Sequence, residues 1–111
     1  MAWKKLEKKE TPMFWWVWKD RVGQALEGYW VGVFDHEDKA KVLVVYDKDK
    51  DLYYRAFVPK RYDLSELKSG WKVRITALQD KETQKLDWEI EYDEKNTQLV
   101  VVPDEYYDVE I

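Results

Sequence analysis

VGQALEGYWVGVF, residues 22–34, is the stretch that decides the fold. Gly28 and Gly32 interrupt what reads as one long strand, and a glycine lets a strand coil sharply or lets another backbone come close. A flat sheet does not need such coiling, whereas the first strand of a small barrel must bend to pair with both halves of the sheet. The stretch therefore predicts a coiled first strand in a small β-barrel.

Length and composition limit the class of protein. The chain has 111 residues, 45% of them hydrophobic and 16% aromatic, which predicts one folded domain. Cysteine is absent, so disulfides, a thiolate nucleophile and Cys-based zinc sites are excluded. No apolar run is long enough to cross a bilayer, and the charged first residues do not read as a signal peptide. We therefore expect an intracellular, cytoplasmic protein.

The charges are segregated along the chain. Residues 1–78 carry 16 Lys and Arg against 12 Asp and Glu, residues 79–96 carry 3 against 7, and residues 97–111 carry none against 4. The net charge of −4 therefore conceals a basic part followed by two acidic ones. This segregation predicts a basic working surface with an acidic tail; an accidental split in a charge-rich chain is the alternative.

These features divide the chain into a basic lead-in (1–12), a barrel domain (13–102) and an acidic C-terminal tail (103–111). The domain opens on MFWWVW, residues 13–18, which predicts a short extended segment. Because successive side chains of an extended chain alternate, Trp15 should face one way and Trp16 and Trp18 the other. One set can be core, and the other then meets a partner, a ligand or a second subunit, unless all three cap the open end of the barrel.

The remaining elements follow from period-two patterns and turn residues. We expect strands at 40–46, 52–58, 71–78 and 85–92, and a sixth strand at 98–102 that ends before a proline. Asp63 and Glu66 have the spacing of a capping box, which predicts a short helix at 64–68. This order of elements is that of the OB-fold, a five-stranded barrel with its helix between strands three and four.

The third strand, LYYRAFV at 52–58, carries the clearest functional pattern. Its alternation places Tyr53, Arg55 and Phe57 on one face and the predicted core residues Leu52, Tyr54, Ala56 and Val58 on the other. Aromatic rings beside a guanidinium are what single-stranded nucleic acid uses for base stacking and phosphate contact. The alternative is that Tyr53 and Phe57 lie under a loop and Arg55 pairs with an acid.

Residues 22–92 also resemble a known family. The resemblance rests on a V-G-x-x-x-E-G-x-x-x-G opening, an aromatic third strand, a leucine-bearing short helix and a G-x-x-V-x-I fourth strand; the matching residues are Val22, Gly23, Glu27, Gly28, Gly32, Gly70, Val73 and Ile75. In this pattern the chain resembles the compact OB-fold single-stranded DNA-binding proteins of viruses and prokaryotes. The resemblance implies sequence-tolerant binding of single-stranded DNA, and an acidic tail that docks replication or repair proteins.

The expected binding residues fall into two chemical groups. Bases would stack on Tyr53, Phe57 and one of Tyr29 or Trp30, with Trp16 or Trp18 at the entrance. Phosphates would be contacted by a set of cations made up of Arg55, Lys60, Arg61, Lys41 and Arg74.

Catalytic and metal sites have little support in the sequence. His36 is the single histidine, and neither Ser65 nor Ser69 has a base and an orienting group at a recognisable spacing. One imidazole beside turn carboxylates makes a poor metal site, and the acidic turn at 47–51 lacks the Gly and distant Glu of a calcium loop. We therefore expect neither an enzyme nor a cofactor.

Two other functions remain open at this stage. One keeps the fold and exchanges DNA for RNA, since no residue recognisably reads a 2′-hydroxyl. The other is a protein-interaction module, in which residues 13–18 and the sixth strand form an interface between copies in a homo-oligomer without a nucleic-acid role.

Overall fold

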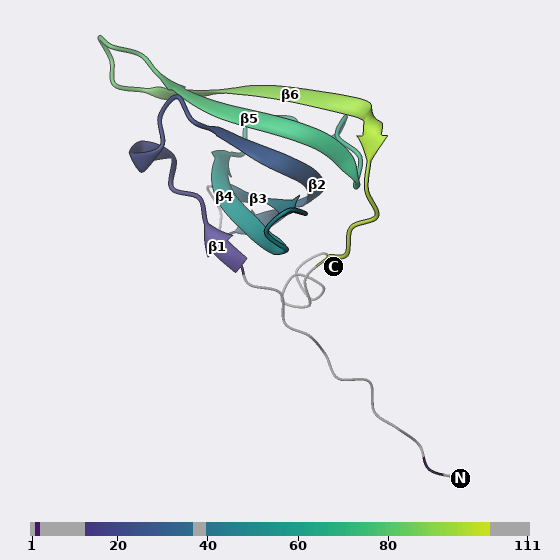
Figure 1. Cartoon of the computed structure of the whole chain (residues 1–111). Helices are drawn as coiled ribbons and strands as arrows, with labels where there is room; N and C mark the ends of the chain where they lie inside the picture. Colours follow the sequence, from purple (N-terminus) through teal and green to yellow (C-terminus); the bar gives the residue numbers. More distant parts are fainter. Residues whose placement is uncertain (1, 3–12, 37–39, 103–111) are drawn as a thin grey trace.

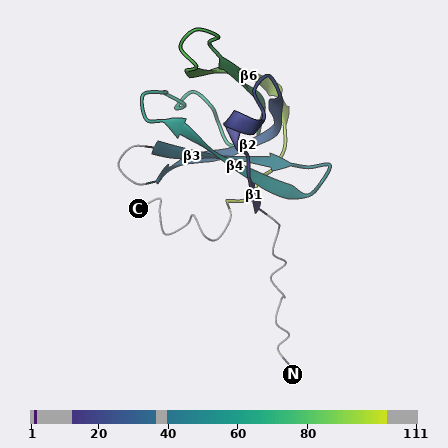
Figure 2. The same ribbon diagram turned by 90° about the vertical axis from the view of Figure 1, so that its left-hand side faces the viewer.

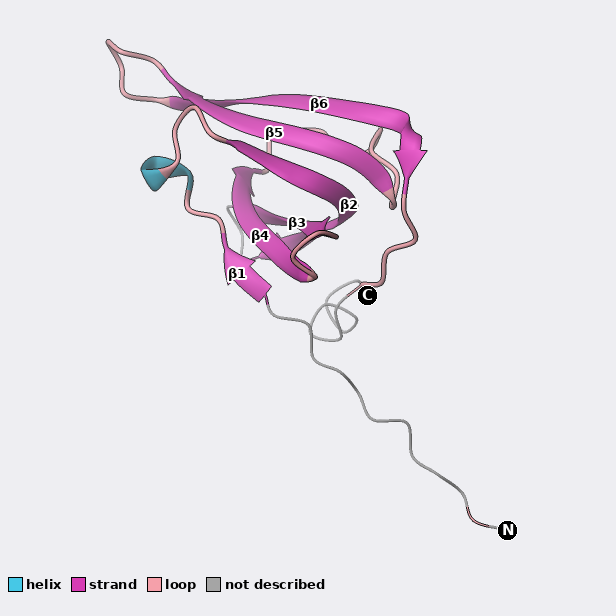
Figure 3. Ribbon diagram, viewed as in Figure 1, coloured by secondary structure: helices cyan, strands magenta, loops and turns pink. Residues whose placement is uncertain are grey.

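The computed structural model describes Ala2 and residues 13–36 and 40–102. Within them lie six strands and one short 3-10 helix (Figures 1 and 3). The elements are β1 (Met13–Trp15), η1 (Trp18–Asp20), β2 (Ala25–His36), β3 (Ala40–Asp47), β4 (Leu52–Pro59), β5 (Trp71–Gln79) and β6 (Leu86–Thr97). The all-β class is confirmed, and the five predicted main strands form, four of them close to their expected bounds. β6 continues to Thr97, five residues beyond the predicted end at residue 92. No helix among the described residues is long and apolar enough to cross a membrane.

The strands form one sheet in the order β1-β4-β3-β2-β5-β6. All neighbours are antiparallel except β1 and β4, which are parallel. Figure 2 shows how the sheet curls, with the β5–β6 hairpin on one side and β3 and β4 on the other. The curl gives the sheet an inner and an outer face.

The central strand β2 confirms the expectation of a coiled first strand. Its first half, Ala25 to Tyr29, pairs with β5, and Tyr29 to His36 pairs with β3. The register shifts between Trp30 and Gly32, as at a β-bulge. A Cβ atom on Gly28 would lie 2.5 Å from the Tyr46 carbonyl oxygen. Gly28 is therefore the position at which β2 and β3 approach too closely for any side chain.

The predicted closed barrel does not form. β4 and β6, which a closed five-stranded barrel would join, lie apart in the strand order. β4 instead pairs along that edge with β1, in the register Met13 to Tyr53 and Trp15 to Arg55. The sheet is therefore open, and its additional strand is N-terminal.

The predicted helix at 64–68 is also absent. That segment consists of turns: the Asp63 carboxylate accepts a hydrogen bond from the Ser65 backbone N–H at 3.0 Å, and the Leu67 N–H donates to the Leu64 carbonyl at 3.1 Å. The Ser65 side chain lowers the pKa of the Asp63 carboxyl most, by hydrogen bonding to it, and the Ser65 backbone N–H lowers it further. Leu64 is buried in the core. Leu67 also packs against this core. A segment of five residues is too short for the several consecutive bonds that a helix needs, and two apolar contacts suffice to hold it as turns.

Residues 98–102 form no strand, contrary to the sequence prediction. This segment, called the strap below, lies across the outer face. Its Gln98 N–H donates to the Gly70 carbonyl at 2.9 Å, and its Val101 carbonyl accepts the Tyr53 hydroxyl at 2.8 Å. The strap is therefore held at separate points and not by a ladder. Residues 1, 3–12 and 103–111, which include most of the lead-in and the whole acidic tail, lie outside the described residues, as do residues 37–39.

Hydrophobic side chains pack on both faces of the sheet. The inner core lies within the curl and includes Leu26, Leu43, Ala56, Ile75 and Ala77, together with the buried tryptophans Trp16, Trp18 and Trp30. The outer core lies under the strap and consists of Val31, Phe34, Val42, Val44 and Tyr53, against which Val100 and Val102 pack. Both faces of the sheet are therefore buried over part of β2, β3 and β4.

Gly28→Ala should destabilise the fold by about 1–3 kcal/mol, because the added methyl meets backbone that can move only with β3. The matched control is Gly32→Ala, whose methyl would meet the far end of the Phe34 ring at 3.2 Å. We expect the control to cost less, since a ring can shift. Urea denaturation of both variants measures the difference, and equal losses would contradict the role assigned to Gly28.

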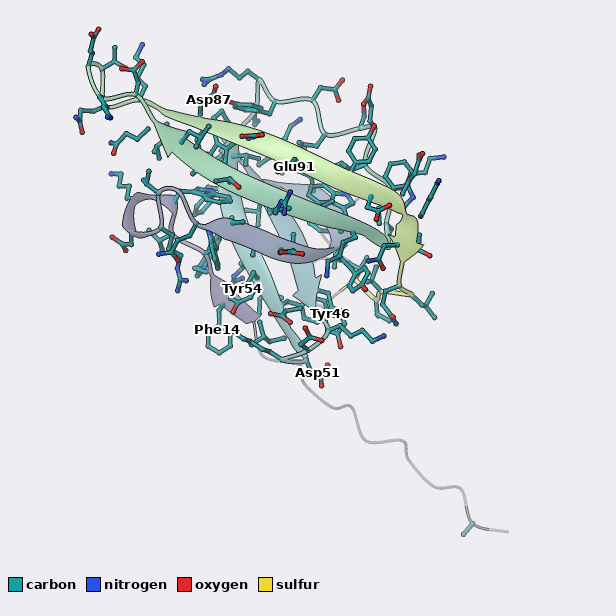
Figure 4. The ribbon with its side chains drawn as sticks, turned by 45° about the horizontal axis from the view of Figure 1, so that its top comes forward. Phe14, Tyr46, Asp51, Tyr54, Asp87 and Glu91 are labelled. Atoms are coloured by element: carbon teal, nitrogen blue, oxygen red, sulfur yellow. The ribbon has the colours of Figure 1, made fainter. Side chains whose placement is uncertain are left out.

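The β3–β4 hairpin predicts one unusual titration. Tyr46 donates a hydrogen bond to Asp51 at 2.6 Å (Figure 4), and this bond, with burial and the nearby carboxylate, raises the pKa of Tyr46 to about 12. Because the folded pKa lies above the ordinary value of 10.0, the associated stability is complete below pH 10 and is lost as pH rises towards 12. Ultraviolet titration should detect one tyrosine that ionises only near pH 12. This signal should be absent in Tyr46→Phe and should move to lower pH in Asp51→Asn.

Candidate nucleic-acid interface

An exposed aromatic pair lies at the edge where β1 joins β4. The rings of Trp15 and Phe57 are stacked, with centroids 4.5 Å apart and planes inclined by 14°. The Arg55 guanidinium carbon lies 4.4 Å from the centre of the Trp15 ring. Trp15 is 40% exposed and Phe57 42%. These three residues, called the aromatic shelf below, combine a flat apolar surface with a cation.

The parallel pairing of β1 with β4 builds this shelf. Trp15 is the register partner of Arg55, so both side chains leave the sheet on the same face, and Phe57 follows Arg55 by two residues on that face. The chain then turns inward. The Trp16 N–H donates to the Arg55 carbonyl at 2.8 Å, and the Trp18 indole N–H donates to the Phe57 carbonyl at 2.8 Å. The shelf is thus fixed to the backbone from beneath.

Behind the shelf, side chains bridge the open side of the curled sheet. Trp18 makes edge-to-face contacts with Trp16 at 6.3 Å and with Trp88 of β6 at 6.1 Å. Trp88 contacts Tyr62 in the same manner at 5.5 Å. Trp16, Trp18 and Trp88 form what we call the tryptophan cluster. It connects β4 to β6 where the backbone makes no ladder.

Several cations lie on the segments next to the shelf. Lys60 and Arg61 are exposed in the turn that follows β4, and Lys41 donates from its ammonium group to the Tyr62 carbonyl at 3.4 Å. The Arg21 guanidinium, just after η1, lies 4.3 Å from the centre of the Trp16 ring. Lys60 and Arg61 are thus two exposed cations directly after β4, with the Asp87 carboxylate close to Arg61 and the Asp63 carboxylate close to Lys41.

Four of the predicted stacking residues are buried. Trp16, Trp18 and Trp30 belong to the inner core, and Tyr53 belongs to the outer core beneath the strap. The alternation of the third strand is confirmed, because Tyr53, Arg55 and Phe57 share a face, but Tyr53 is covered as the alternative interpretation supposed. A buried ring offers no surface to a base, so these four residues support the site without lining it.

Two other predicted residues lie away from the shelf. The Arg74 guanidinium forms two hydrogen bonds with the Glu91 carboxylate, at 3.1 and 2.9 Å, which raise the pKa of Arg74 and lower that of Glu91. Arg74 is therefore paired with a carboxylate, on an acidic face where Asp87 and Glu91 are visible in Figure 4. Tyr29 lies on β2 with its ring 4.8 Å from the Lys72 ammonium.

Trp15 is the shelf residue that the sequence prediction did not assign to binding. The alternation in residues 13–18 did place it opposite Trp16 and Trp18, which is confirmed. What was missing was its neighbour, because parallel pairing with β4 leaves no local signal. No three His, Asp or Glu side chains among the described residues gather closely enough to hold a metal ion.

Comparison with known proteins leaves this geometry as the basis for a functional assignment. No protein-family model, curated protein or solved structure matches the chain.

The attachment of the shelf can be tested with two matched tryptophan variants. Trp18→Phe keeps an aromatic ring but removes the donor to the Phe57 carbonyl, whereas Trp16 has an indole N–H without a hydrogen-bond partner among the described residues. Trp18→Phe should therefore destabilise the protein by about 1–3 kcal/mol more than Trp16→Phe. Chemical denaturation measures both. Equal losses would show that ring volume alone matters at these positions.

Proposed function

We propose that this protein binds single-stranded DNA without marked sequence preference, and that the aromatic shelf is the main contact. The observation that carries the proposal is the exposed Trp15–Phe57 stack against the Arg55 guanidinium. Every base has a flat face that can stack on such rings, so binding of this kind tolerates sequence. Protection of exposed single strands during replication or repair is the role this chemistry suits.

The exposure of the shelf supports a binding role. An aromatic pair left in water forgoes the stabilisation that burial would bring, and contiguous exposed apolar surface often marks an interaction site. The Arg55 cation next to the Trp15 ring adds attraction for a phosphate and for the π-face of a base.

The surrounding cations supply the second part of the proposed interface. Lys60 and Arg61 follow Phe57 by three and four residues, in the turn that the Tyr62 N–H closes by donating to the Pro59 carbonyl at 3.1 Å. Lys19 and Arg21 lie on the segment that Trp18 attaches to the Phe57 carbonyl. Each phosphate that such a cation neutralises should make the affinity fall with rising salt. Lys41 contributes by holding the turn that carries Lys60 and Arg61.

The strand arrangement is compatible with an OB-fold, which we propose as the ancestry of β2 to β6. β2 pairs with both β3 and β5, β3 pairs with β4, and β5 pairs with β6. This is the OB-fold order without the pairing that closes the barrel. In that interpretation β1 and the tryptophan cluster occupy the position of the closing pair.

A protein-interaction role is the second candidate, favoured by one observation. β1 is an edge strand, and Phe14, Trp15 and Val17 are all substantially exposed on it or just beyond it. Edge strands with apolar side chains can pair with another chain. In that case Trp15 would be covered by a second copy, and oligonucleotides would not compete.

The proposal is tested by titrating tryptophan fluorescence with oligo-dT at low and at higher salt. We expect saturable quenching that weakens as salt rises. Trp15→Ala should lower the affinity by about 1–3 kcal/mol without unfolding the protein. The control is Leu78→Ala, which removes an exposed apolar side chain on β5 and should leave binding unchanged.

Three results would contradict or redirect this assignment. Unaltered binding by Trp15→Ala would remove the shelf from the interface. A complete lack of binding to oligo-dT, with a concentration-dependent dimer, would favour the protein-interaction role. A matched RNA oligomer that competes better than DNA would make RNA the ligand.

A further inference from the structure

A second aromatic surface lies on β5 and β6, at the other edge of the sheet from the shelf. The rings of Trp71, at the start of β5, and Tyr92, on β6, are stacked with centroids 5.4 Å apart and planes inclined by 19°. The Lys68 ammonium lies 5.9 Å from the centre of the Trp71 ring, and Tyr92 is 51% exposed. Trp71, Tyr92 and Lys68 are called the second patch below. Its composition matches that of the shelf: two stacked rings and one cation.

Irregular backbone builds the second patch. Trp71 pairs with Thr97, but the next residue, Lys72, pairs with Asp93, so β6 carries extra residues opposite this point. One of them, Asn96, accepts a hydrogen bond from the Tyr29 hydroxyl at 3.2 Å. Bulges of this kind often re-aim side chains beside binding sites.

Gly70 completes the construction of the second patch. Its φ of 95° is unfavourable for other residues, and a Cβ there would lie 2.7 Å from the Gln98 carbonyl oxygen. The backbone bond from Gln98 to Gly70 therefore fixes the start of the strap at the second patch. The second patch and the strap are thus joined through Gly70.

The strap leads from the second patch towards the shelf. It is attached at Gln98 to Gly70 and at Val101 to Tyr53, and Tyr53 is the register partner of Met13 in β1. Along the strap the side chains alternate: Val100 and Val102 pack on the outer core, whereas Leu99 is 89% exposed and Val101 61%. The outward side of the strap is thus apolar.

We infer that one nucleic-acid strand runs from the aromatic shelf over the strap to the second patch, so that Tyr92 and Trp71 stack a second set of bases. The inference rests on the proposed function and extends its site. Gln98 to Val101 spans about 10 Å of extended chain and Tyr53 to Phe57 about 13 Å. The two patches are therefore separated by several nucleotides, within the roughly 4–16 that one OB-type domain covers.

Charge places the phosphates of such a strand near Lys68, which lies against Trp71. Lys72 leaves β5 on the other face, where it lies against Tyr29 and 4.0 Å from Glu27. The shelf has Arg55 in the corresponding position. The exposed apolar strap carries no cation between these ends. The expected interface therefore has a cationic group beside each pair of stacked rings and an apolar middle.

The test compares two oligo-dT lengths by fluorescence anisotropy with the full chain. The shorter oligomer, about 5 nucleotides, can reach one patch, and the longer, about 15 nucleotides, can reach both. Tyr92→Ala should weaken binding of the longer oligomer by about 5-fold to about 150-fold and leave the shorter one unchanged. Trp15→Ala should weaken both. Tyr92→Phe should bind as the unaltered protein does, and Leu78→Ala is the control for loss of an exposed apolar side chain.

The outcomes separate this inference from the proposed function. If Trp15→Ala weakens binding and Tyr92→Ala binds both oligomers normally, the second patch is not part of the interface although the function stands. Lys68→Gln, which leaves both rings in place, should also weaken only the longer oligomer; a normal affinity there would count equally against the inference. Failure of the unaltered protein to bind either oligomer overturns both proposals. A dimer that Tyr92→Ala abolishes would overturn the inference alone, because it would assign Tyr92 to a protein interface.

Discussion

The close approach of β3 to Gly28 is the constraint on which the rest of the structure depends. No side chain fits between Gly28 and the Tyr46 carbonyl, and this lets β2 pass from β5 to β3 within a single residue, Tyr29. One strand can then serve both halves of a curled sheet. The inner core lies within this curl, and the outer core lies on the other face of the sheet under the strap. A longer side chain at this position would oppose all of these features together.

The open side of the curled sheet is what makes the aromatic shelf possible. If β6 paired with β4, the edge that receives β1 would be occupied, and Trp15 would have no place beside Arg55. The tryptophan cluster closes that side with edge-to-face contacts, each worth roughly 0.5–1.5 kcal/mol beyond the area it buries. Contacts between side chains fix the relative position of β4 and β6 less strictly than a hydrogen-bond ladder would. They leave the β4 backbone free to pair with β1. The same residues thus complete the core and position the exposed rings above it.

Period-two patterns made most strands and the all-β class predictable, because each strand has one face buried along much of its length. They did not reveal what covers the other face. Tyr53 was correctly placed beside Arg55 and Phe57, yet its burial depends on a strap 48 residues away in the chain. Arg74 was a reasonable phosphate ligand until the β5–β6 register set Glu91 opposite it. The short helix at 64–68 and the strand at 98–102 failed for a related reason: their local signals were weak, and anchors such as Leu64 and Val100 decided the backbone path.

Both ends of the described chain close on β4. The Trp18 indole reaches the Phe57 carbonyl across a sequence separation of 39 residues, and Tyr53 reaches Val101 across 48. Contacts between residues so far apart in the sequence require the closure of long loops, so they form late and slow the folding of β-rich domains. The β2–β3–β4 meander, with short connections, can assemble first. During synthesis β1 would then emerge early but remain without its partner until β4 had followed, and the rings that it carries would be the last to reach their stacked arrangement.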